Sequence, residues 1–305
     1  MNKVIFFLVV ICLQSTGTWA INKTSGLEQQ RLYVKSKGFA PNPNTESNNQ
    51  EIINGIKVSW NGATAYQKHV ITKLISGLIL VEGDTFIMGS NDPNDKREQP
   101  AHLERVTSFW IDRYEVTKGL WDAVTGDSYE LHSDYDISSN DDMTTNQRLI
   151  RDNDFPVLVF SSPDNWKTAM NFIRKLNMLT GLKFRLPSEA EWEFAAKGGK
   201  RSKGYKYSGS NTLDEVGWHD GNSNRKIHTV GMKQPNELGI YDMSGNVSEW
   251  TSDLFTENYN SFPSDDEYIN TARGGFYWRS DCGVIHRSYG DTDGGYVGLR
   301  LVLDY

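Results

Sequence analysis

The cysteines and histidines have the strongest chemical potential in this sequence, because thiolates and imidazoles are common protein nucleophiles and transition-metal ligands. The chain has two cysteines, Cys12 in an apolar N-terminal run and Cys282 near the carboxyl end. A lone cysteine is more often a small buried hydrophobe than a nucleophile. The six histidines are His69, His102, His132, His219, His228 and His286. No two of them stand three or four residues apart, which argues against a non-haem iron site on one helix face.

A polar stretch in the first half contains acidic residues at the spacing of a calcium-binding loop. Asp134, Asp136 and Ser138 match the first side-chain positions of an EF-hand. Its sixth position, however, is Ser139 instead of glycine, and its twelfth is Thr145 instead of glutamate. Those two positions form the turn and supply the bidentate ligand. We therefore interpret this stretch as a solvated loop.

The first twenty residues have the pattern of a secretory signal peptide. Lys3 gives a positive start, residues 4–13 are apolar, and Thr18 and Ala20 place small residues before a cleavage point. An apolar run of roughly ten residues is too short to span a bilayer, and no later stretch reaches that length. We expect cleavage after Ala20 and a protein that is secreted or placed in the periplasm or cell envelope.

Removal of this segment would leave one cysteine, so we expect no internal disulfide. A lipid anchor at Cys12 is the alternative to free secretion. A lipoprotein signal has a small residue directly before its cysteine, and Ile11 stands there instead.

The rest of the sequence describes one acidic, aromatic-rich domain behind a polar leader. The 305 residues have a net charge of −7 and no lysine or arginine run. This argues against nucleic acid as a partner, because phosphate binding needs a concentrated basic face. Residues 21–52 are polar and poor in aromatics, so we expect a flexible leader there and a domain over residues 53–305.

The elements that would position functional residues are short and separated by irregular connections. Periodicity and turn signals predict strands within residues 78–90, 109–112 and 298–303, and helices over residues 117–124, over residues 163–180 and after Ser188. Ser188 and Glu191 form a capping box, and Gly198 ends that helix. Helices and strands do not alternate as βαβ units, so the predicted fold class is α+β.

Six ordered segments resemble one family. They are residues 81–90 (VEGDTFIMGS), 112–117 (DRYEVT), 185–196 (RLPSEAEWEFAA), 236–250 (NELGIYDMSGNVSEW), 273–275 (RGG) and 298–302 (GLRLV). Together they are similar to the formylglycine-generating enzyme, or sulfatase-modifying factor, domain over about residues 78–305. The resemblance implies a compact domain related to C-type lectins, with little regular secondary structure.

The resemblance also shows which residues are replaced. Enzymes of this family use two cysteines after the Arg-Gly-Gly segment to bind copper and oxidise a substrate cysteine to formylglycine. The corresponding positions here are Arg279 and Val284, and Cys282 lies between them. Because Cu(I) needs paired thiolates, we expect no copper and no copper-dependent formylglycine formation. Members of the ergothioneine-synthesis type use histidine-bound iron with an added helical domain, for which the leader is too short.

A structural calcium site is the second implication of the resemblance. The matching family loop would supply the carboxylates of Asp242 and Glu249 and the carbonyl oxygens of Gly245 and Val247. Calcium takes six to eight hard oxygens, so such a loop is chemically suited to it. The alternative is a tight turn in which Asp242 and Asn246 accept hydrogen bonds from backbone amides.

These observations favour a non-catalytic binding or assembly module, whose irregular loops recognise a protein, peptide or glycan. Aromatic turns at Trp218, Tyr277, Trp278 and Tyr296 are candidates to line a shallow pocket, although core packing is the commoner role of such residues. One alternative is an oxidoreductase of the formylglycine-generating or non-haem iron type that acts on proteins. Another is a structural subunit of an envelope or secretion complex. An open groove along residues 279–287 would indicate a binding or active site.

Overall fold

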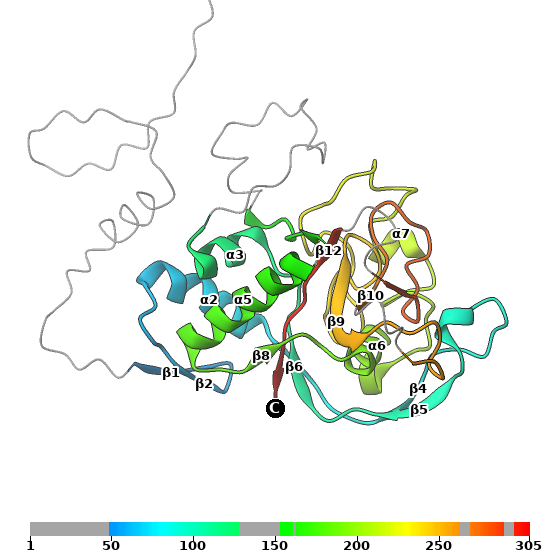
Figure 1. Cartoon of the computed structure of the whole chain (residues 1–305), viewed down its shortest axis with the longest axis horizontal. Helices are drawn as coiled ribbons and strands as arrows, with labels where there is room; N and C mark the ends of the chain where they lie inside the picture. The colour runs from blue at the N-terminus through cyan, green and yellow to red at the C-terminus, as the bar shows by residue number, and fades with distance from the viewer. Residues whose placement is uncertain (1–48, 128–152, 161–162, 263–268, 290–295) are drawn as a thin grey trace, which may run out of the picture. The chain divides into compact units, whose positions relative to one another are not determined.

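The computed structural model describes residues 49–127, 153–160, 163–262, 269–289 and 296–305, all within a unit that spans Pro41–Tyr305 (Figure 1). The predicted signal peptide, most of the predicted leader and the stretch from Asp134 to Thr145 lie outside these residues. Among the helices that are described, none is both long enough and apolar enough to cross a membrane.

Short helices and strands are both present, which confirms the predicted α+β class. The helices are α2 (Ala65–Gly77), α3 (Lys118–Thr125), α5 (Pro163–Thr180), α6 (Glu189–Ala196) and the short α7 (Leu213–Val216), with 3-10 turns η1 (Lys96–Glu98) and η2 (Gly199–Arg201). The strands are β1 (Gln50–Ile53), β2 (Ile56–Ser59), β3 (Ile79–Val81), β4 (Thr85–Met88), β5 (His102–Arg105), β6 (Phe109–Ile111), β7 (Val159–Phe160), β8 (Phe184–Arg185), β9 (Ser248–Leu254), β10 (Asn270–Arg273), β11 (Arg287–Tyr289), β12 (Tyr296–Gly298) and β13 (Val302–Asp304).

The three helices expected from the sequence are present, and α3 and α6 begin at their predicted caps. Thr117 accepts a hydrogen bond from the Leu120 amide and begins α3, and Gly126 in the left-handed region ends it. At α6, the Ser188 hydroxyl accepts from the Glu191 amide at 3.1 Å while the Glu191 carboxylate accepts from the Ser188 amide at 2.8 Å. The capping box therefore satisfies amides that a helix start leaves unpaired.

Helix α2 was not expected from the sequence, although it has a capping box of its own. The Thr64 hydroxyl accepts from the Gln67 amide at 3.2 Å, and the Gln67 side chain accepts from the Thr64 amide at 2.9 Å. Ile71, Leu74 and Ile75 are its buried residues and follow helical spacing. The same signature that located α6 would have located α2.

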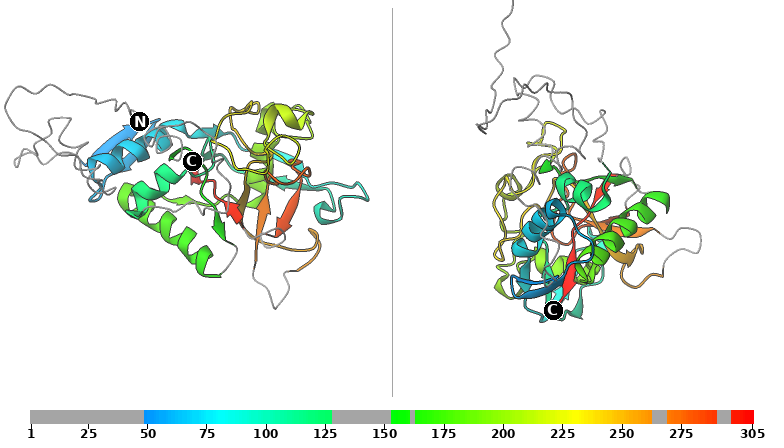
Figure 2. Two further views of the ribbon diagram at one scale, coloured as in Figure 1. Left: turned by 90° about the horizontal axis from the view of Figure 1, so that it is seen from above. Right: turned by 90° about the vertical axis from the view of Figure 1, so that its left-hand side faces the viewer.

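Helices α2, α3 and α5 pack together at one end of the domain, whereas β9 to β11 lie towards the other (Figures 1 and 2). Trp121 of α3 stacks on Phe172 of α5, with ring centroids 4.7 Å apart. The β1–β2 pair also contributes Ile56 and Val58 to this core. β1 starts at Gln50, three residues before the domain boundary that the composition predicted.

Two sheets form the remainder of the frame. One has the order β11-β10-β9-β12-β7, and the other has the order β3-β6-β13-β8, while β4 and β5 pair by themselves. The two strands expected within residues 78–90 therefore exist but belong to different sheets. Between them Gly83 passes the backbone of residues 106–108 so closely that a Cβ atom would lie 2.4 Å from the Val106 carbonyl oxygen.

The chain also changes sheets at its carboxyl end, where one continuous strand was expected. β12 lies beside β9, and β13 lies between β6 and β8. The intervening Leu299, Arg300 and Leu301 are fully buried. This crossing places the Arg300 guanidinium between the two sheets.

Candidate functional site

The positions that hold paired cysteines in the family enzymes lie on the segment between β10 and β11. Cys282, the remaining thiol there, is fully buried, and its sulfur lies 3.6 Å from the Arg279 carbonyl oxygen and 3.9 Å from that of Phe276. Burial raises the pKa of Cys282 to about 12. A thiol that stays protonated is a poor nucleophile and a poor metal ligand.

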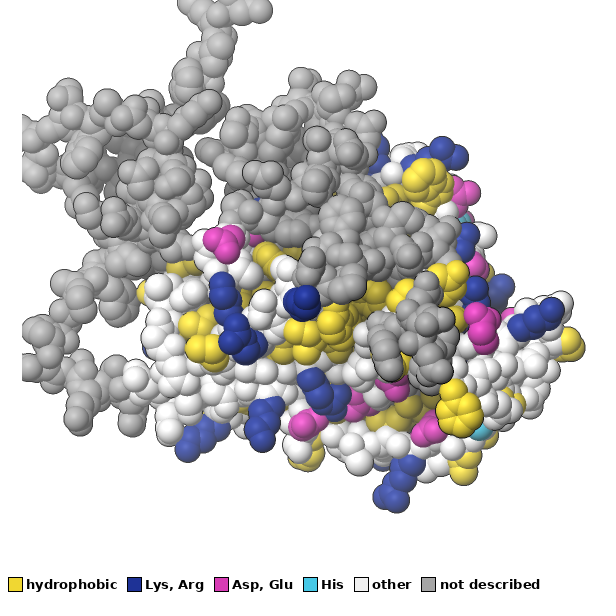
Figure 3. Space-filling view, in the orientation of Figure 1, with side chains coloured by type: hydrophobic (Ala, Val, Ile, Leu, Met, Phe, Trp, Pro, Cys, Tyr) yellow, Lys and Arg dark blue, Asp and Glu magenta, His cyan; other side chains and the backbone are white. Residues whose placement is uncertain are grey.

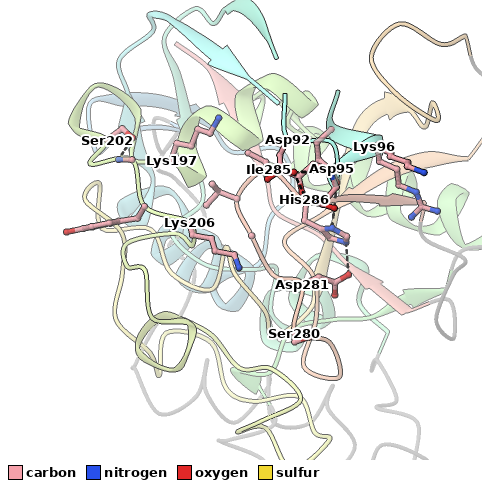
Figure 4. A pocket seen from close by; sticks show the side chains of 17 residues that line it. Asp92, Asp95, Lys96, Lys197, Ser202, Lys206, Ser280, Asp281, Ile285 and His286 are labelled. Carbon is pink, nitrogen blue, oxygen red and sulfur yellow. Dashed lines mark hydrogen bonds and ion pairs between the residues drawn. The ribbon is translucent and has the colours of Figure 1, made fainter. Parts of the chain in front are cut away.

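A cavity of about 820 Å³ opens beside this segment (Figure 4). Ser280, Asp281 and residues 283–286 form part of its lining, and the rest comes from the loop around η1, from Lys197 and Ser202, and from residues 204–206. The segment that replaces the two cysteines is therefore open to solvent on this side. This is the arrangement that the sequence analysis identified as the mark of a binding or active site.

His286 lies between two carboxylates at one side of the cavity. Its Nδ1 is 3.7 Å from a carboxylate oxygen of Glu98, and its Nε2 is 3.6 Å from one of Asp281. Burial lowers the pKa of His286, against the opposing effect of the two acids. The carboxylate of the buried Glu98 also accepts a hydrogen bond from the Arg287 amide at 3.0 Å.

Two arginines at the ends of the segment between β10 and β11 form ion pairs with helix α6. Arg273 donates to Glu189 at 2.7 Å and to Glu193 at 2.6 Å, and Arg287 donates to the other oxygen of Glu189 at 2.9 Å. Although burial opposes it, the two guanidinium groups hold the pKa of Glu189 below its usual range. These charge-assisted bonds fix both ends of the loop that lines the cavity.

Two lysines line the opposite side of the cavity. The Lys197 ammonium donates to Glu193 at 2.6 Å and to the Ile87 carbonyl at 2.9 Å. Lys206 lies with its ammonium 5.1 Å from the centre of the Tyr207 ring and has no ion pair with any residue that the structure describes. Figure 4 shows the Lys206 side chain running towards the side that bears Asp281 and His286.

The predicted calcium loop is irregular between residues 242 and 247, and β9 begins directly after it at Ser248. One oxygen of the buried Asp242 accepts from the Gly231 amide at 2.6 Å, and the other has no hydrogen-bond partner among the described residues. Asn246 accepts from the His228 amide at 2.9 Å. Both side chains thus accept from backbone amides, but these amides lie 11 and 18 residues away and not within the loop itself. Asp242 retains one oxygen for a further partner.

Glu249 is engaged differently. Its carboxylate receives bonds from the Arg300 guanidinium at 2.9 and 3.0 Å and from the Trp192 indole at 2.7 Å. Arg300 also donates to the carbonyls of Asp112 and Tyr241. The residue expected to bind calcium at the end of the loop therefore already joins α6, β9 and the crossing between the sheets.

Glu115 was missed by the sequence analysis and belongs to the same buried group. Its carboxylate accepts from the Val247 amide at 3.1 Å and from the Asn246 side chain at 2.7 Å. Burial, followed by the charges of Asp242 and Glu249, raises its pKa well above the usual value. Only its place in the DRYEVT segment could have drawn attention to it.

We use the name acidic core for Asp112, Glu115, Asp242, Glu249 and Arg300. Burial raises the pKa of Asp112 to about 7 and that of Asp242 to about 6. Four buried carboxylates thus share one guanidinium.

An unpaired Asp242 oxygen and this excess of acid fit a divalent cation. In the described part of the chain, no three His, Cys, Asp or Glu side chains converge in a metal-binding geometry. A calcium ion would therefore depend on backbone carbonyls, such as the family-implied ones of Gly245 and Val247.

The aromatic side chains considered for a shallow pocket have different surroundings. Tyr277 is buried in a small core, whereas Trp278 is 49% exposed, with the Arg225 guanidinium 5.1 Å from its ring. Trp218 stacks on His228 at 3.7 Å. The side chain of Tyr296 lies outside the described residues.

The fold and these segments define a formylglycine-generating-enzyme-like domain of the C-type-lectin-related type. The chain belongs to the family described as sulfatase-modifying factor enzyme 1-like domains, whose model matches residues 64–305. The resemblance read from the sequence is thereby confirmed. The match begins early enough to include α2.

Several characterised proteins share this domain. The chain is 32% identical over 268 residues to the chaperone protein LppX of Paenibacillus barcinonensis, a match that covers 76% of this chain and 90% of that protein. It is 23% identical over 287 residues to the formylglycine-generating enzyme of Bos taurus, with 75% of each chain covered.

Solved structures show the same fold. Treponema denticola variable protein 1 matches with a TM-score of 0.57 and 23% identity, over 86% of this chain and all of that one. PvdO of Pseudomonas aeruginosa matches with a TM-score of 0.56 and 23% identity, over 75% of this chain and 94% of that one.

Proposed function

We propose that this protein is a non-catalytic binding protein that holds a segment of a partner protein in the cavity beside residues 279–287. The observation that carries the proposal is that the paired cysteines of the family enzymes are replaced while a cavity is present beside their positions. Arg279 and Val284 stand in place of the paired cysteines, and the one nearby thiol is buried and protonated. The cavity remains, and it can receive a chain without performing oxidation.

The relationship to LppX supports a role in handling another protein, because that relative is described as a chaperone. Charge on the surface also fits a protein partner better than a nucleic acid. Figure 3 shows lysine and arginine side chains interspersed with acidic ones on the face that it presents, without a continuous basic area. We further propose that the protein works outside the cytoplasm after removal of residues 1–20.

Calcium is proposed as a structural ion of the acidic core. Asp242 would bind it through the oxygen that has no other partner. After burial, the charges of Asp242 and Glu249 further raise the pKa of Glu115, so the group lacks positive charge. When bound, the ion supplies positive charge that favours the ionised carboxylates. Its proposed role is to brace the loop before β9, away from the cavity.

Site-specific photo-crosslinking tests the proposed binding site. A photoreactive amino acid at Ser280, an exposed residue that lines the cavity, should produce one defined adduct with a partner protein in the source cells. The same amino acid at Met178, which is 64% exposed on α5, is the matched control. Adducts of equal yield at both positions, or none at Ser280, would contradict the proposal.

Metal analysis separates this function from the oxidoreductase alternative. Purified protein should contain no stoichiometric copper or iron, and it should form no aldehyde on a cysteine-containing peptide in the presence of copper and oxygen. Stoichiometric redox metal together with aldehyde formation would replace the binding proposal with an enzymatic one.

A further inference from the structure

The charges that line the cavity are divided between its two sides (Figure 4). Asp92, Asp95 and Asp281 belong to one side, and Lys197 and Lys206 belong to the other. Two cations, Lys96 and Arg97, also lie on the side of Asp95. Figure 4 shows the Lys96 side chain running away from the opposite lysines, and the Arg97 guanidinium lies over the rings of Phe255 and Tyr289. A ligand that fills this space therefore meets negative charge along one side and positive charge along the other. Electrostatic complementarity of this kind selects partners and fixes their orientation.

On the acidic side, the carboxylate of Asp95 is the one left without a partner. Asp92 accepts two hydrogen bonds from Asn94, at 2.8 and 2.9 Å, and Asp281 faces His286. Asp95 precedes η1, yet its side chain makes no capping bond and no ion pair with the described residues. It is half-buried, so its charge is less screened by water than that of a fully exposed residue.

On the basic side, Lys206 is the residue whose charge is available. Lys197 is already neutralised by Glu193 at 2.6 Å. The backbone of Lys206 is fixed, because its amide donates to Asn211 at 2.9 Å and its carbonyl accepts from the Val284 amide at 3.1 Å. With its backbone held and its ammonium free, Lys206 is a suitable donor to a carboxylate of a ligand.

We infer that the cavity selects a peptide segment of mixed charge, with a basic side chain beside Asp95 and an acidic side chain beside Lys206. This inference rests on the proposed binding function and specifies its ligand. Cysteine has no part in it, since the Cys282 sulfur is buried and is not among the lining groups. A peptide with either charge alone would satisfy one side and leave the other unpaired.

Fluorescein-labelled glycine-rich peptides test the inference. One set contains a lysine and an aspartate separated by one, two or three glycines, and the matched sets replace lysine by glutamine, aspartate by asparagine, or both. Fluorescence anisotropy with the full-length protein should show tightest binding for a lysine–aspartate peptide. Removal of either charge should weaken binding by about fivefold, which corresponds to about 1 kcal/mol for a partly exposed ion pair.

Protein variants show which cavity residue binds each charge of the peptide. Lys206→Gln should abolish the preference for aspartate over asparagine, and Asp95→Asn should abolish the preference for lysine over glutamine. Lys203→Gln is the matched control, because Lys203 is an exposed neighbour that does not line the cavity. Its preferences should equal those of the unaltered protein.

The outcomes distinguish the inference from the proposed function. Equal binding of charged and neutral peptides would overturn the charge pattern and leave peptide binding in place. Absence of binding to every peptide would overturn the inference, while crosslinking at Ser280 would still decide the binding function separately. Loss of preference in the Lys203 variant as well would show a general effect of surface charge and would also overturn it.

Discussion

The acidic core and the cavity are built from the same kinds of charged side chain, but they use them in opposite ways. In the acidic core, Arg300 and Glu249 are both fully buried and bind each other, so the chain itself satisfies that pair. In the cavity, Asp95 and Lys206 remain without ion pairs among the described residues. A buried charge that loses its partner lowers the free energy of unfolding, whereas a solvated charge is stable without a partner and remains available to a ligand.

Removal of the central guanidinium should have the largest effect. Arg300→Met leaves four buried carboxylates without their shared cation, and we expect a loss of about 3–5 kcal/mol in the free energy of unfolding. Urea unfolding measures it, with Arg185→Met as the control, since Arg185 is 38% exposed and pairs near the surface. A loss below about 1 kcal/mol for Arg300→Met is the value expected of an exposed ion pair, and it would contradict a stabilising role of Arg300 in the acidic core.

Calcium removal should have the next largest effect. Because an ion that binds only the folded state stabilises it by mass action, calcium at a hundred times its Kd should add about 2.7 kcal/mol. Chelation by EGTA should lower the melting temperature of the unaltered protein and leave that of Asp242→Asn almost unchanged. A melting temperature that does not depend on calcium would contradict the calcium proposal and favour a loop held by hydrogen bonds alone.

The pH dependence of the free energy of unfolding should reflect the raised pKa values of the carboxyl groups in the acidic core. Asp112 and Asp242 have folded pKa values of about 7 and about 6, above those of unfolded aspartate, so the folded protein holds their protons more tightly. Their contribution to stability is therefore present at low pH and is lost as pH rises from about 4 to about 7, by up to about 1.4 kcal/mol per pH unit and proton.

Unfolding titrations in EGTA measure this slope. Asp242→Asn should make it shallower, and calcium should oppose the loss at higher pH by favouring the ionised carboxylates. A slope that is identical in the variant and the unaltered protein would show that Asp242 titrates in the same way in both states.

The smallest effect on stability is expected in the cavity. Asp95→Asn removes a carboxylate that supports no described contact, so the free energy of unfolding should change by less than about 0.5 kcal/mol. Thermal unfolding checks this, alongside the peptide measurements that the same variant should alter. A larger loss would indicate that Asp95 stabilises the loop around η1.

Much of this fold could be predicted because its signals are local. Thr117, Ser188 and Glu191 marked helix starts through short-range capping, and the family segments indicated the domain. Thr64 and Gln67 form the same kind of capping box, which marks the start of α2, a helix that the sequence analysis did not predict. Strand partners could not be predicted, because the division of residues 78–90 between two sheets depends on contacts with β5 and β6.

The sites were less accessible to sequence analysis for the same reason. Glu115 lies more than a hundred residues from Asn246, and the bond between them depends on the completed fold. The cavity likewise combines η1 with residues 204–206 and 283–286, which no spacing rule connects. By contrast, the replaced cysteines were visible at once, since Arg279 and Val284 are counted from a nearby Arg-Gly-Gly segment.

The crossing from β12 to β13 has a consequence for the order of synthesis. Among the described strands β13 is synthesised last, yet it lies between β6 and β8 in the interior of its sheet. Val302 and Leu303 must therefore insert between strands made long before them, and Arg300 arrives only then to neutralise Glu249. A chain truncated before Leu299 should remain open to proteases, because one sheet then lacks β13 and both sheets lack the residues that join them.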